Sequence, residues 1–270
     1  MFTLDKMLKV RRAMSAKLKQ SFEGYLPQQE SYRNIAEGHF RLECLDAENR
    51  VVDVYDNHNM IVTTARRSMA EIFFASDCAH AHRLVLGTQG AKDVSIYKAK
   101  DETDGLSKSR TCIFSEIKGT YAEGTMIDTL LKGDVIKVGE NYYRADADFE
   151  GVVVSTEVLS SDFTQIQAPF TYSVEFAMTG VDTAEGENIC TSSRSDVVKA
   201  KLSDTSVIFT FYIDADHGND QNNTDEYDIP TTLFNEAGLY VNGRLFAMRT
   251  FPSKIKDETV KLRVIWTITF

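Results

Sequence analysis

A chain of 270 residues with 43% hydrophobic and 10% aromatic side chains can bury a sizeable core, which argues against disorder over its whole length. Its formal net charge of −10 argues against a general nucleic-acid-binding protein, because such proteins present a basic surface. The sequence contains no apolar run as long as a secretory signal core or a membrane span, so we expect a soluble protein with no membrane partner.

Residues 3–22 are predicted to form a helix, which Thr3 or Asp5 can cap. Their apolar side chains recur every three to four positions, as one face of a helix requires. Residues 5–19 have a local charge of +5, so the rest of the chain carries −15. The opposite face of the helix is basic and carries Lys6, Lys9, Arg11, Arg12, Lys17 and Lys19.

Gly24, Pro27 and a polar stretch interrupt the helical pattern, so residues 1–36 are predicted to be a basic helical arm with a linker. A basic arm on an acidic body attracts a neighbouring copy or another acidic protein, and we expect its six basic residues to form a partner interface. No aromatic side chain lies between Asp5 and Lys19 to stack on bases, so specific nucleic-acid binding is not expected. A solvated helix face is the alternative.

From His39 the hydrophobic period changes from that of a helix to that of a strand. Residues 39–46 and 50–56 alternate apolar and polar side chains on either side of a short turn. This pattern predicts a β-hairpin.

An internal helix is expected over residues 63–75, where either Thr63 or Thr64 can be the N-cap. Residues 83–90 then predict a strand that enters a glycine turn. The side chains of the helix that are expected to face inward are Met69, Ile72 and Phe73.

The middle of the chain contains short β-type segments that follow a polar region. Residues 90–110 are polar and predict an exposed loop. Between residues 111 and 215, runs rich in Val, Ile, Thr, Phe and Tyr predict strands separated by turns. Such regular spacing is typical of a sandwich or a barrel.

The final segment has the clearest local pattern. Asn242-Gly243 supplies the two residues with positive φ that a type I′ hairpin turn requires, and residues 260–270 alternate as a closing strand. The predicted fold is mainly β, with an antiparallel sandwich-like core, an N-terminal helix and one internal helix. Residues 37–270 would form a β-rich structural domain, with two subdomains as an alternative.

Carboxylates crowd between Asp214 and Asp228 and could hold Ca²⁺ through hard oxygen ligands. The spacing differs from that of an EF-hand, because Gly218 stands where a ligand belongs and Asn219 stands where the glycine belongs. We interpret the segment as a solvated acidic loop between two strands, and metal binding stays an open alternative.

Cys78, His80 and His82 occupy alternate positions, so an extended segment would place them on one side. A thiolate and two imidazoles suit Zn²⁺. The sequence offers no evident fourth ligand, and the flanking alanines favour a plain loop after the helix.

Motifs for catalysis are missing from the sequence. It contains no Gly-x-Ser-x-Gly elbow, no His-Glu-x-x-His pair and no phosphate-binding loop. We therefore expect a protein that is not an enzyme, and we assign no catalytic, cofactor-binding or metal-binding residue. Four cysteines without a Cys-x-x-Cys pair predict free thiols made in a reducing compartment: Cys44, Cys78, Cys112 and Cys190.

One segment, residues 233–270, resembles the C-terminal region of bacteriophage virion proteins of the tail-fibre, baseplate and collar type. The resemblance rests on Asn235-Glu236-Ala237-Gly238-Leu239-Tyr240, on Ala247-Met248-Arg249-Thr250-Phe251 and on the closing strand from Leu262 to Phe270. A looser match covers residues 59–74 with the strand and glycine turn of residues 83–90, where these proteins have Gly-Thr-Gly and this chain has Gly87-Thr88-Gln89-Gly90.

The resemblance implies a structural virion component of the tail, neck or baseplate that assembles with itself and with other virion proteins. It also implies synthesis in the cytoplasm of a bacterial host. Two other interpretations stay open. One is a receptor- or carbohydrate-binding module with Tyr142 and Tyr143 as exposed contacts, and the other is an enzyme that degrades the cell envelope through carboxylates near Asp214–Asp228.

Overall fold

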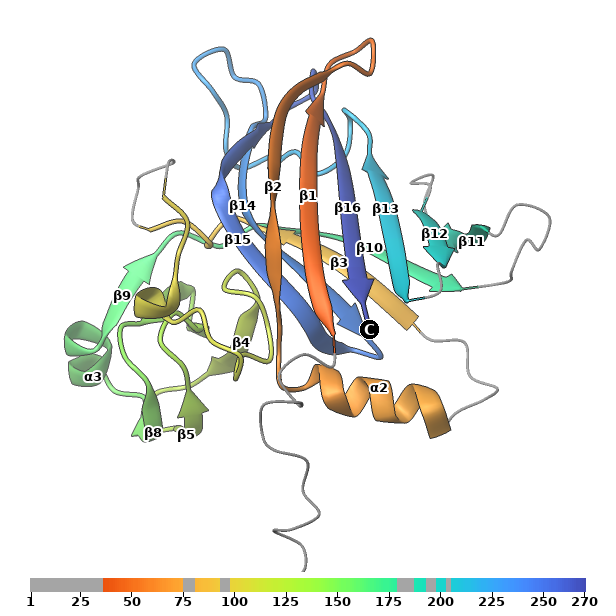
Figure 1. Ribbon diagram of the computed structural model, residues 1–270. Helices are drawn as coiled ribbons and strands as arrows, with labels where there is room; N and C mark the ends of the chain where they lie inside the picture. Colours follow the sequence, from red (N-terminus) through yellow and green to blue (C-terminus); the bar gives the residue numbers. More distant parts are fainter. Residues whose placement is uncertain (1–35, 75–80, 93–97, 179–186, 193–197, 203–204) are drawn as a thin grey trace, which may run out of the picture. The chain divides into compact units, whose positions relative to one another are not determined.

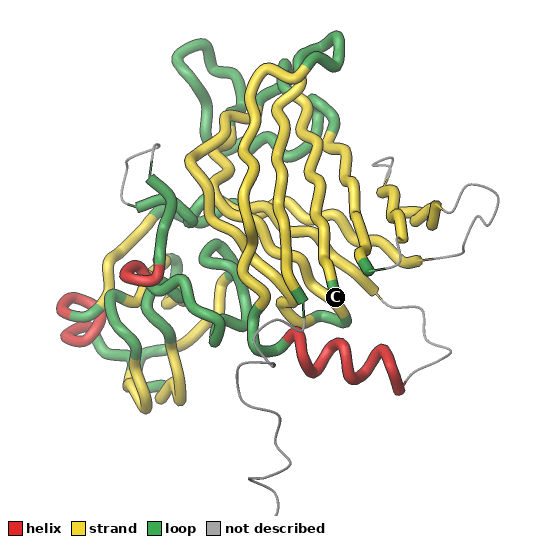
Figure 2. The backbone as a smooth tube through the Cα atoms, viewed as in Figure 1, coloured by secondary structure: helices red, strands yellow, loops and turns green. Residues whose placement is uncertain are grey.

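The computed structural model describes residues 36–74, 81–92, 98–178, 187–192, 198–202 and 205–270. These residues are mainly β, as the sequence predicts, and most of the strands are antiparallel (Figures 1 and 2). The expected helix over residues 3–22 and its six basic side chains lie outside the described residues, so the basic arm stays a prediction.

Ten strands pair in one antiparallel sheet whose order is β1-β16-β13-β12-β11-β10-β3-β14-β15-β2, and the sheet closes because β2 also pairs with β1 (Figure 1). The strands are β1 (Glu37–Leu45), β2 (Val51–Ile61), β3 (Ala81–Gly87), β10 (Thr171–Met178), β11 (Glu187–Ser192), β12 (Val198–Leu202), β13 (Ser206–Ile213), β14 (Thr232–Val241), β15 (Arg244–Lys256) and β16 (Lys261–Thr269).

This closed sheet differs from the expected sandwich, in which two separate sheets face each other. Only two residue pairs join β15 to β2, Ala247↔Ile61 and Met248↔Met60, so the sheet closes over a short stretch. The alternation of apolar and polar residues predicts one buried face for each strand, and both a sandwich and a barrel satisfy that condition.

The chain between β3 and β10 forms two smaller sheets. Four strands pair in the order β4-β6-β7-β9, with β4 and β6 parallel, and β5 pairs with β8. The helical elements there are η2 (Glu102–Asp104) and α3 (Thr156–Ser161). The strands are β4 (Ile117–Tyr121), β5 (Met126–Leu130), β6 (Val135–Val138), β7 (Asn141–Ala145), β8 (Phe149–Val153) and β9 (Phe163–Ile166).

The core of the closed sheet is aromatic. Trp266 is fully buried, and its ring lies 5.0 Å from that of Phe40, which in turn stacks on Phe251 at 5.4 Å. The predicted alternation of the closing strand is confirmed, because every second residue of β16 from Leu262 to Ile268 is buried. Burial of these large rings contributes a major part of the stability.

The internal helix is confirmed as α2 (Ala65–Phe74). Thr64, one of the two predicted N-cap residues, directly precedes it, and its carbonyl oxygen accepts hydrogen bonds from the amides of Arg67 and Ser68. The hydroxyl of Thr64 donates a hydrogen bond to the carbonyl oxygen of Leu245 at 2.6 Å, so it connects the helix to β15. The predicted hairpin turn is confirmed, because φ is 50° at Asn242 and 74° at Gly243. The β1–β2 hairpin is confirmed as well.

Candidate functional site

Glu236 on β14 is completely buried, and its carboxylate holds together two loops that are distant in the sequence. It accepts hydrogen bonds from the amides of Phe114 at 2.7 Å, Ser115 at 2.8 Å and Gln89 at 3.3 Å, and from the hydroxyl of Ser115. Burial raises the pKa of Glu236, while the Ser115 hydrogen bond and the charge of Lys100 act in the opposite direction.

The neighbours of Glu236 on β14 extend this connection. The side-chain oxygen of Asn235 accepts a hydrogen bond from the amide of Gly90 at 2.6 Å. The hydroxyl of Tyr240 accepts a hydrogen bond from the amide of Ile113 at 3.0 Å and donates one to Glu116. β14 therefore fastens residues 88–90 and 113–116 to the closed sheet.

Gly87 and Gly90 allow this close approach. A Cβ atom at position 87 would collide with the side chains of Ser115 and Glu236, and one at position 90 would collide with the backbone of Asn235. Glycine is therefore required at both positions for the loop to reach β14.

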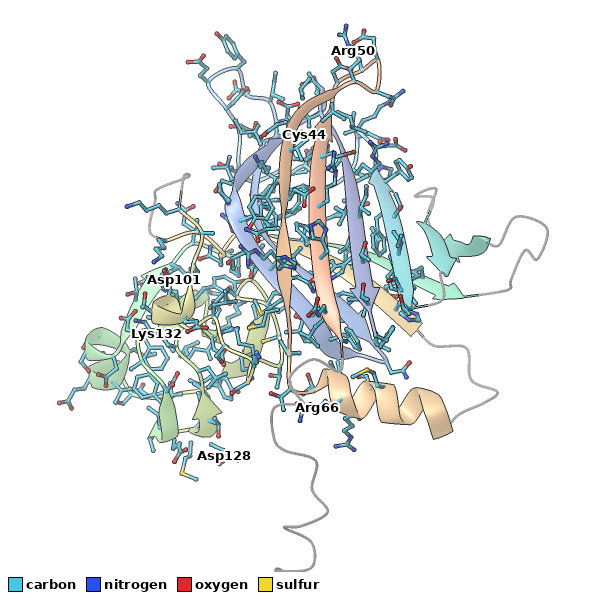
Figure 3. All side chains as sticks on the ribbon, in the orientation of Figure 1. Cys44, Arg50, Arg66, Asp101, Asp128 and Lys132 are labelled. Carbon is cyan, nitrogen blue, oxygen red and sulfur yellow. The ribbon has the colours of Figure 1, made fainter. Side chains whose placement is uncertain are left out.

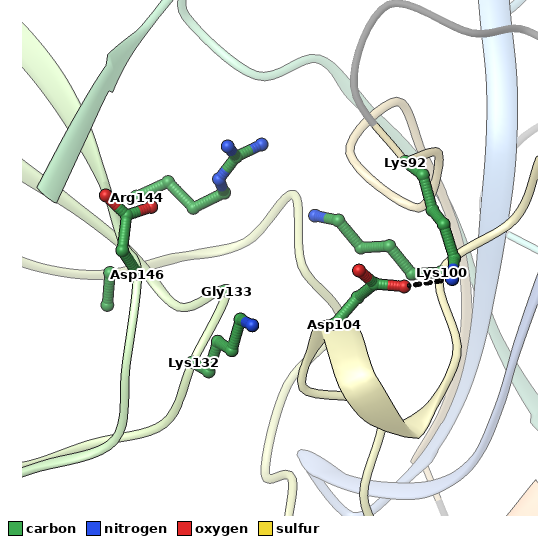
Figure 4. A pocket seen from close by; sticks show the side chains of 8 residues that line it. Lys92, Lys100, Asp104, Lys132, Gly133, Arg144 and Asp146 are labelled. Atoms are coloured by element: carbon green, nitrogen blue, oxygen red, sulfur yellow. Dashed lines mark ion pairs between the residues drawn. The ribbon is translucent and has the colours of Figure 1, made fainter.

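Beside this connection lies a basic cavity of about 230 Å³ (Figure 4). Four of the lining side chains are basic and two are acidic, which gives a net charge of +2 in a chain whose net charge is −10. Lys92, Lys100 and Asp104 line one side, and the β5–β6 turn with the end of β7 lines the other. The lining residues are Lys92, Lys100, Asp104, Lys132, Gly133, Arg144, Ala145 and Asp146.

Lys100 is the most unusual residue of this cavity, since only 6% of it is exposed and its Nζ has no hydrogen-bond partner among the described residues. The ammonium lies 4.3 Å from the centre of the Phe114 ring. Its backbone is fixed by an amide hydrogen bond to Gly90 and by Thr250, whose hydroxyl donates to the Lys100 carbonyl oxygen. Burial lowers the pKa of Lys100 to about 8.

The other basic side chains of the cavity differ in how they are held. Lys92 forms ion pairs with Asp101 at 2.6 Å and Asp104 at 2.8 Å, and Lys132 donates to the carbonyl oxygen of Thr103 at 2.8 Å. The half-buried Arg144 makes no side-chain hydrogen bond or ion pair within the described part of the chain.

A buried ion pair supports the wall that carries Lys132. Arg110 and Asp134 are both buried, and their side chains meet at 2.6 Å. The guanidinium of Arg110 also donates to the carbonyl oxygen of Lys132 at 3.1 Å and lies over the Phe114 ring at 3.9 Å. This pair fixes the turn at Lys132. Residues 101–103 and 108–109 are exposed, as predicted for the polar region, but Lys100 and Arg110 are buried.

A buried lysine of β15, Lys256, forms hydrogen bonds with the acidic loop between Asp214 and Asp228. Lys256 is completely buried, and its Nζ donates hydrogen bonds of 2.8 Å to the carbonyl oxygens of Ala215 and Asp257 and to the side chain of Asn219. Within the residues that the structure describes, no three His, Cys, Asp or Glu side chains are grouped closely enough to hold a metal ion.

The remaining candidate residues are dispersed. Cys78 and His80 lie outside the described residues, and His82 is buried beside the rings of Phe176 and Phe209. Tyr142 and Tyr143 are half-buried, so the prediction that they are exposed contacts is wrong. Tyr143 packs against the hydrophobic core of the small sheets, which includes Ile136 and Phe163.

Comparison with known proteins finds no matching family model, no similar curated protein and no similar solved structure. Within the described residues, neither α-helix has the length and apolar character needed to cross a membrane.

Proposed function

We propose that this chain is a non-enzymatic structural component of a bacteriophage virion, located in the tail, neck or baseplate. It would be made in the bacterial host cytoplasm and would assemble with itself and with other virion proteins. The proposal starts from the resemblance of residues 233–270 and 83–90 to such proteins.

One observation carries the proposal: the two segments that bear the resemblance are neighbours in space. β3 and β14 pair from Glu236↔Gly87 to Val241↔His82. The amides of Gln89 and Gly90, which follow β3, donate hydrogen bonds to Glu236 and Asn235. Segments recognised independently in the sequence therefore form one structural unit.

The role of these residues within the unit is mechanical. Asn235, Glu236 and Tyr240 are buried, and their polar atoms are used to fasten a loop. Buried, satisfied polar networks specify one rigid arrangement, which suits a protein that holds neighbours in a particle. A fold does not determine a function, so the proposal requires a test on the particle.

Immunogold electron microscopy of intact particles, combined with mass spectrometry of purified particles, provides that test. Label at the neck supports a collar or connector component, and label at the distal tip supports a baseplate or fibre component. Particles without label and without peptides of this chain would contradict the proposal.

A further inference from the structure

We propose that the basic cavity lined by Lys92, Lys100, Lys132 and Arg144 is a binding site for a dianionic phosphate group. This inference goes beyond the proposed role in a particle and does not depend on it. It rests on the geometry of the cavity and on the hydrogen-bonding groups that face it.

The first argument is the buried ammonium of Lys100. An ammonium offers three donors, yet the Nζ of Lys100 has no hydrogen-bond partner among the described residues although the side chain is 94% buried. Burying an unpaired charge is costly, and an acceptor that enters the cavity reduces that cost. In Figure 4 the Nζ of Lys100 points into the space between Asp104 and Arg144.

The second argument is the guanidinium of Arg144, which faces the same space from the opposite wall (Figure 4). A guanidinium presents a planar set of donors that match two oxygens of a phosphate, and such bidentate pairs are strong. Because the guanidinium makes no side-chain hydrogen bond within the described residues, its donors are available to a ligand. Arg144 is therefore assigned as the direct ligand, and Lys100, whose Nζ is itself buried, supplies an unpaired positive charge directly behind the cavity wall.

Lys92 and Lys132 have a different role. Both side chains already have oxygen partners. Lys92 forms ion pairs with two aspartates, and Lys132 donates a hydrogen bond to the carbonyl oxygen of Thr103. The two aspartates offset the charge of Lys92, whereas Lys132, bound only to a neutral carbonyl oxygen, adds positive potential to the cavity. A cavity lined by one excess sign of charge concentrates ions of the other sign.

Size and charge select the ligand class. The cavity volume of about 230 Å³ is below the range of roughly 300–1,000 Å³ that is typical of sites for larger organic ligands. The lining side chains have a net charge of +2, or +1 when Asp101 beside Lys92 is included, and a phosphate group carries a charge of about −2 near neutral pH. A small phosphate therefore fits better than a saccharide or a monoanion.

Isothermal titration calorimetry on the full chain at pH 7 and constant ionic strength, with chloride as background, tests this site. Inorganic phosphate and glycerol 3-phosphate are titrated separately, and acetate serves as a monoanion. The variants are Arg144→Gln and Lys100→Met. Arg50→Gln is the matched control, because it removes one positive charge at the tip of the β1–β2 hairpin, far from Lys132 (Figure 3).

We expect saturable one-to-one phosphate binding to the unaltered chain and to Arg50→Gln, and at least a tenfold loss of affinity in each cavity variant. Tighter binding of glycerol 3-phosphate identifies a phosphate ester as the ligand, and tighter binding of inorganic phosphate identifies the free ion. The inference is overturned if millimolar phosphate gives no saturable heat, if acetate binds as tightly, or if Arg144→Gln binds phosphate like the unaltered chain.

Discussion

Glu236 and Ser115 lie 121 residues apart in the sequence, and the carboxylate of Glu236 accepts hydrogen bonds from both the amide and the hydroxyl of Ser115. The same carboxylate accepts a hydrogen bond from the amide of Phe114, and the ring of Phe114 lies against the ammonium of Lys100. One acidic side chain thus determines where an aromatic ring and a buried cation are placed.

Replacing Glu236 by alanine should destabilise the protein by about 3 kcal/mol or more, because two buried amides lose their acceptor and a buried unpaired donor costs about 1–3 kcal/mol. Urea unfolding followed by circular dichroism measures the change. Glu226→Ala, which alters an exposed side chain, is the control and should have little effect. A loss below about 1 kcal/mol for Glu236→Ala would contradict this structural role.

Lys256 and Lys254 lie two residues apart on β15 and provide a matched comparison. Lys256→Met leaves three oxygens without their donor, so we expect a loss of about 2–3 kcal/mol in the free energy of unfolding. Lys254→Met breaks only an ion pair with the exposed Asp53, which contributes roughly 0–1 kcal/mol. Thermal and urea unfolding measure the free energy of unfolding of both variants. Equal losses of stability in the two variants would contradict the role of the Lys256 hydrogen bonds.

The stability of the protein should depend on pH through Lys100. Its pKa is lowered to about 8 in the folded state from the ordinary value of 10.5, so between these values the unfolded chain binds more protons. The stability contribution of Lys100 therefore rises with pH across this window. Glu236 and Asp104 oppose the lowering of the pKa, and Arg144 and Arg110 reinforce it.

Other groups also titrate in this range, so the test compares the unaltered chain with Lys100→Met. At pH 7 the variant should be the more stable, because a buried charge is replaced by an apolar side chain of similar length. This advantage should decrease by at most about 3 kcal/mol between pH 8 and 10.5. Urea unfolding at several pH values that shows a constant difference would refute the assignment.

The thiols of Cys44 and Cys112 should be unreactive in the folded protein. Burial raises the pKa of each to about 11, so little thiolate is present at neutral pH. Iodoacetamide at pH 7.5, followed by peptide mass spectrometry, should leave both unmodified until urea is added. Rapid modification of Cys44 in the native protein would show that its strand opens.

The basic arm can be tested in the full chain by replacing its basic side chains with glutamine. We expect the variant to form smaller assemblies than the unaltered chain at low ionic strength, with the same circular dichroism spectrum. Size-exclusion chromatography with light scattering measures the assemblies. Unchanged assembly would mean that the arm is not the partner interface. The residues replaced are Lys6, Lys9, Arg11, Arg12, Lys17 and Lys19.

Local features of the fold could be predicted from the sequence where a short pattern determines the conformation. Asn242-Gly243 requires positive φ at both positions, and the alternation of β16 requires one buried face. The partner of each buried face depends on distant strands, and for that reason the sequence pattern could not decide between a sandwich and the closed sheet. Val52 illustrates the limit, because it lies in an alternating segment and is nevertheless 60% exposed.

The candidate site was less predictable. Lys100 lies in a polar segment that has the composition of a solvated loop, whereas Arg144 lies 44 residues further along in a run that predicts a strand. They line one cavity because Glu236 and the Arg110–Asp134 ion pair hold distant segments together, and no local pattern encodes that approach. The glycines at positions 87 and 90 were the available signal, since they indicate a close approach of two backbones.

The ammonium of Lys256 has a consequence for the conditions under which the protein keeps its shape. The Nζ of Lys256 donates hydrogen bonds to Ala215 and Asn219 and so fastens the base of the loop between β13 and β14 to β15. Burial lowers the pKa of Lys256 to about 8, so alkaline media can neutralise the ammonium. A neutral amine has one donor fewer and forms weaker hydrogen bonds than an ammonium, so alkaline conditions should loosen this loop.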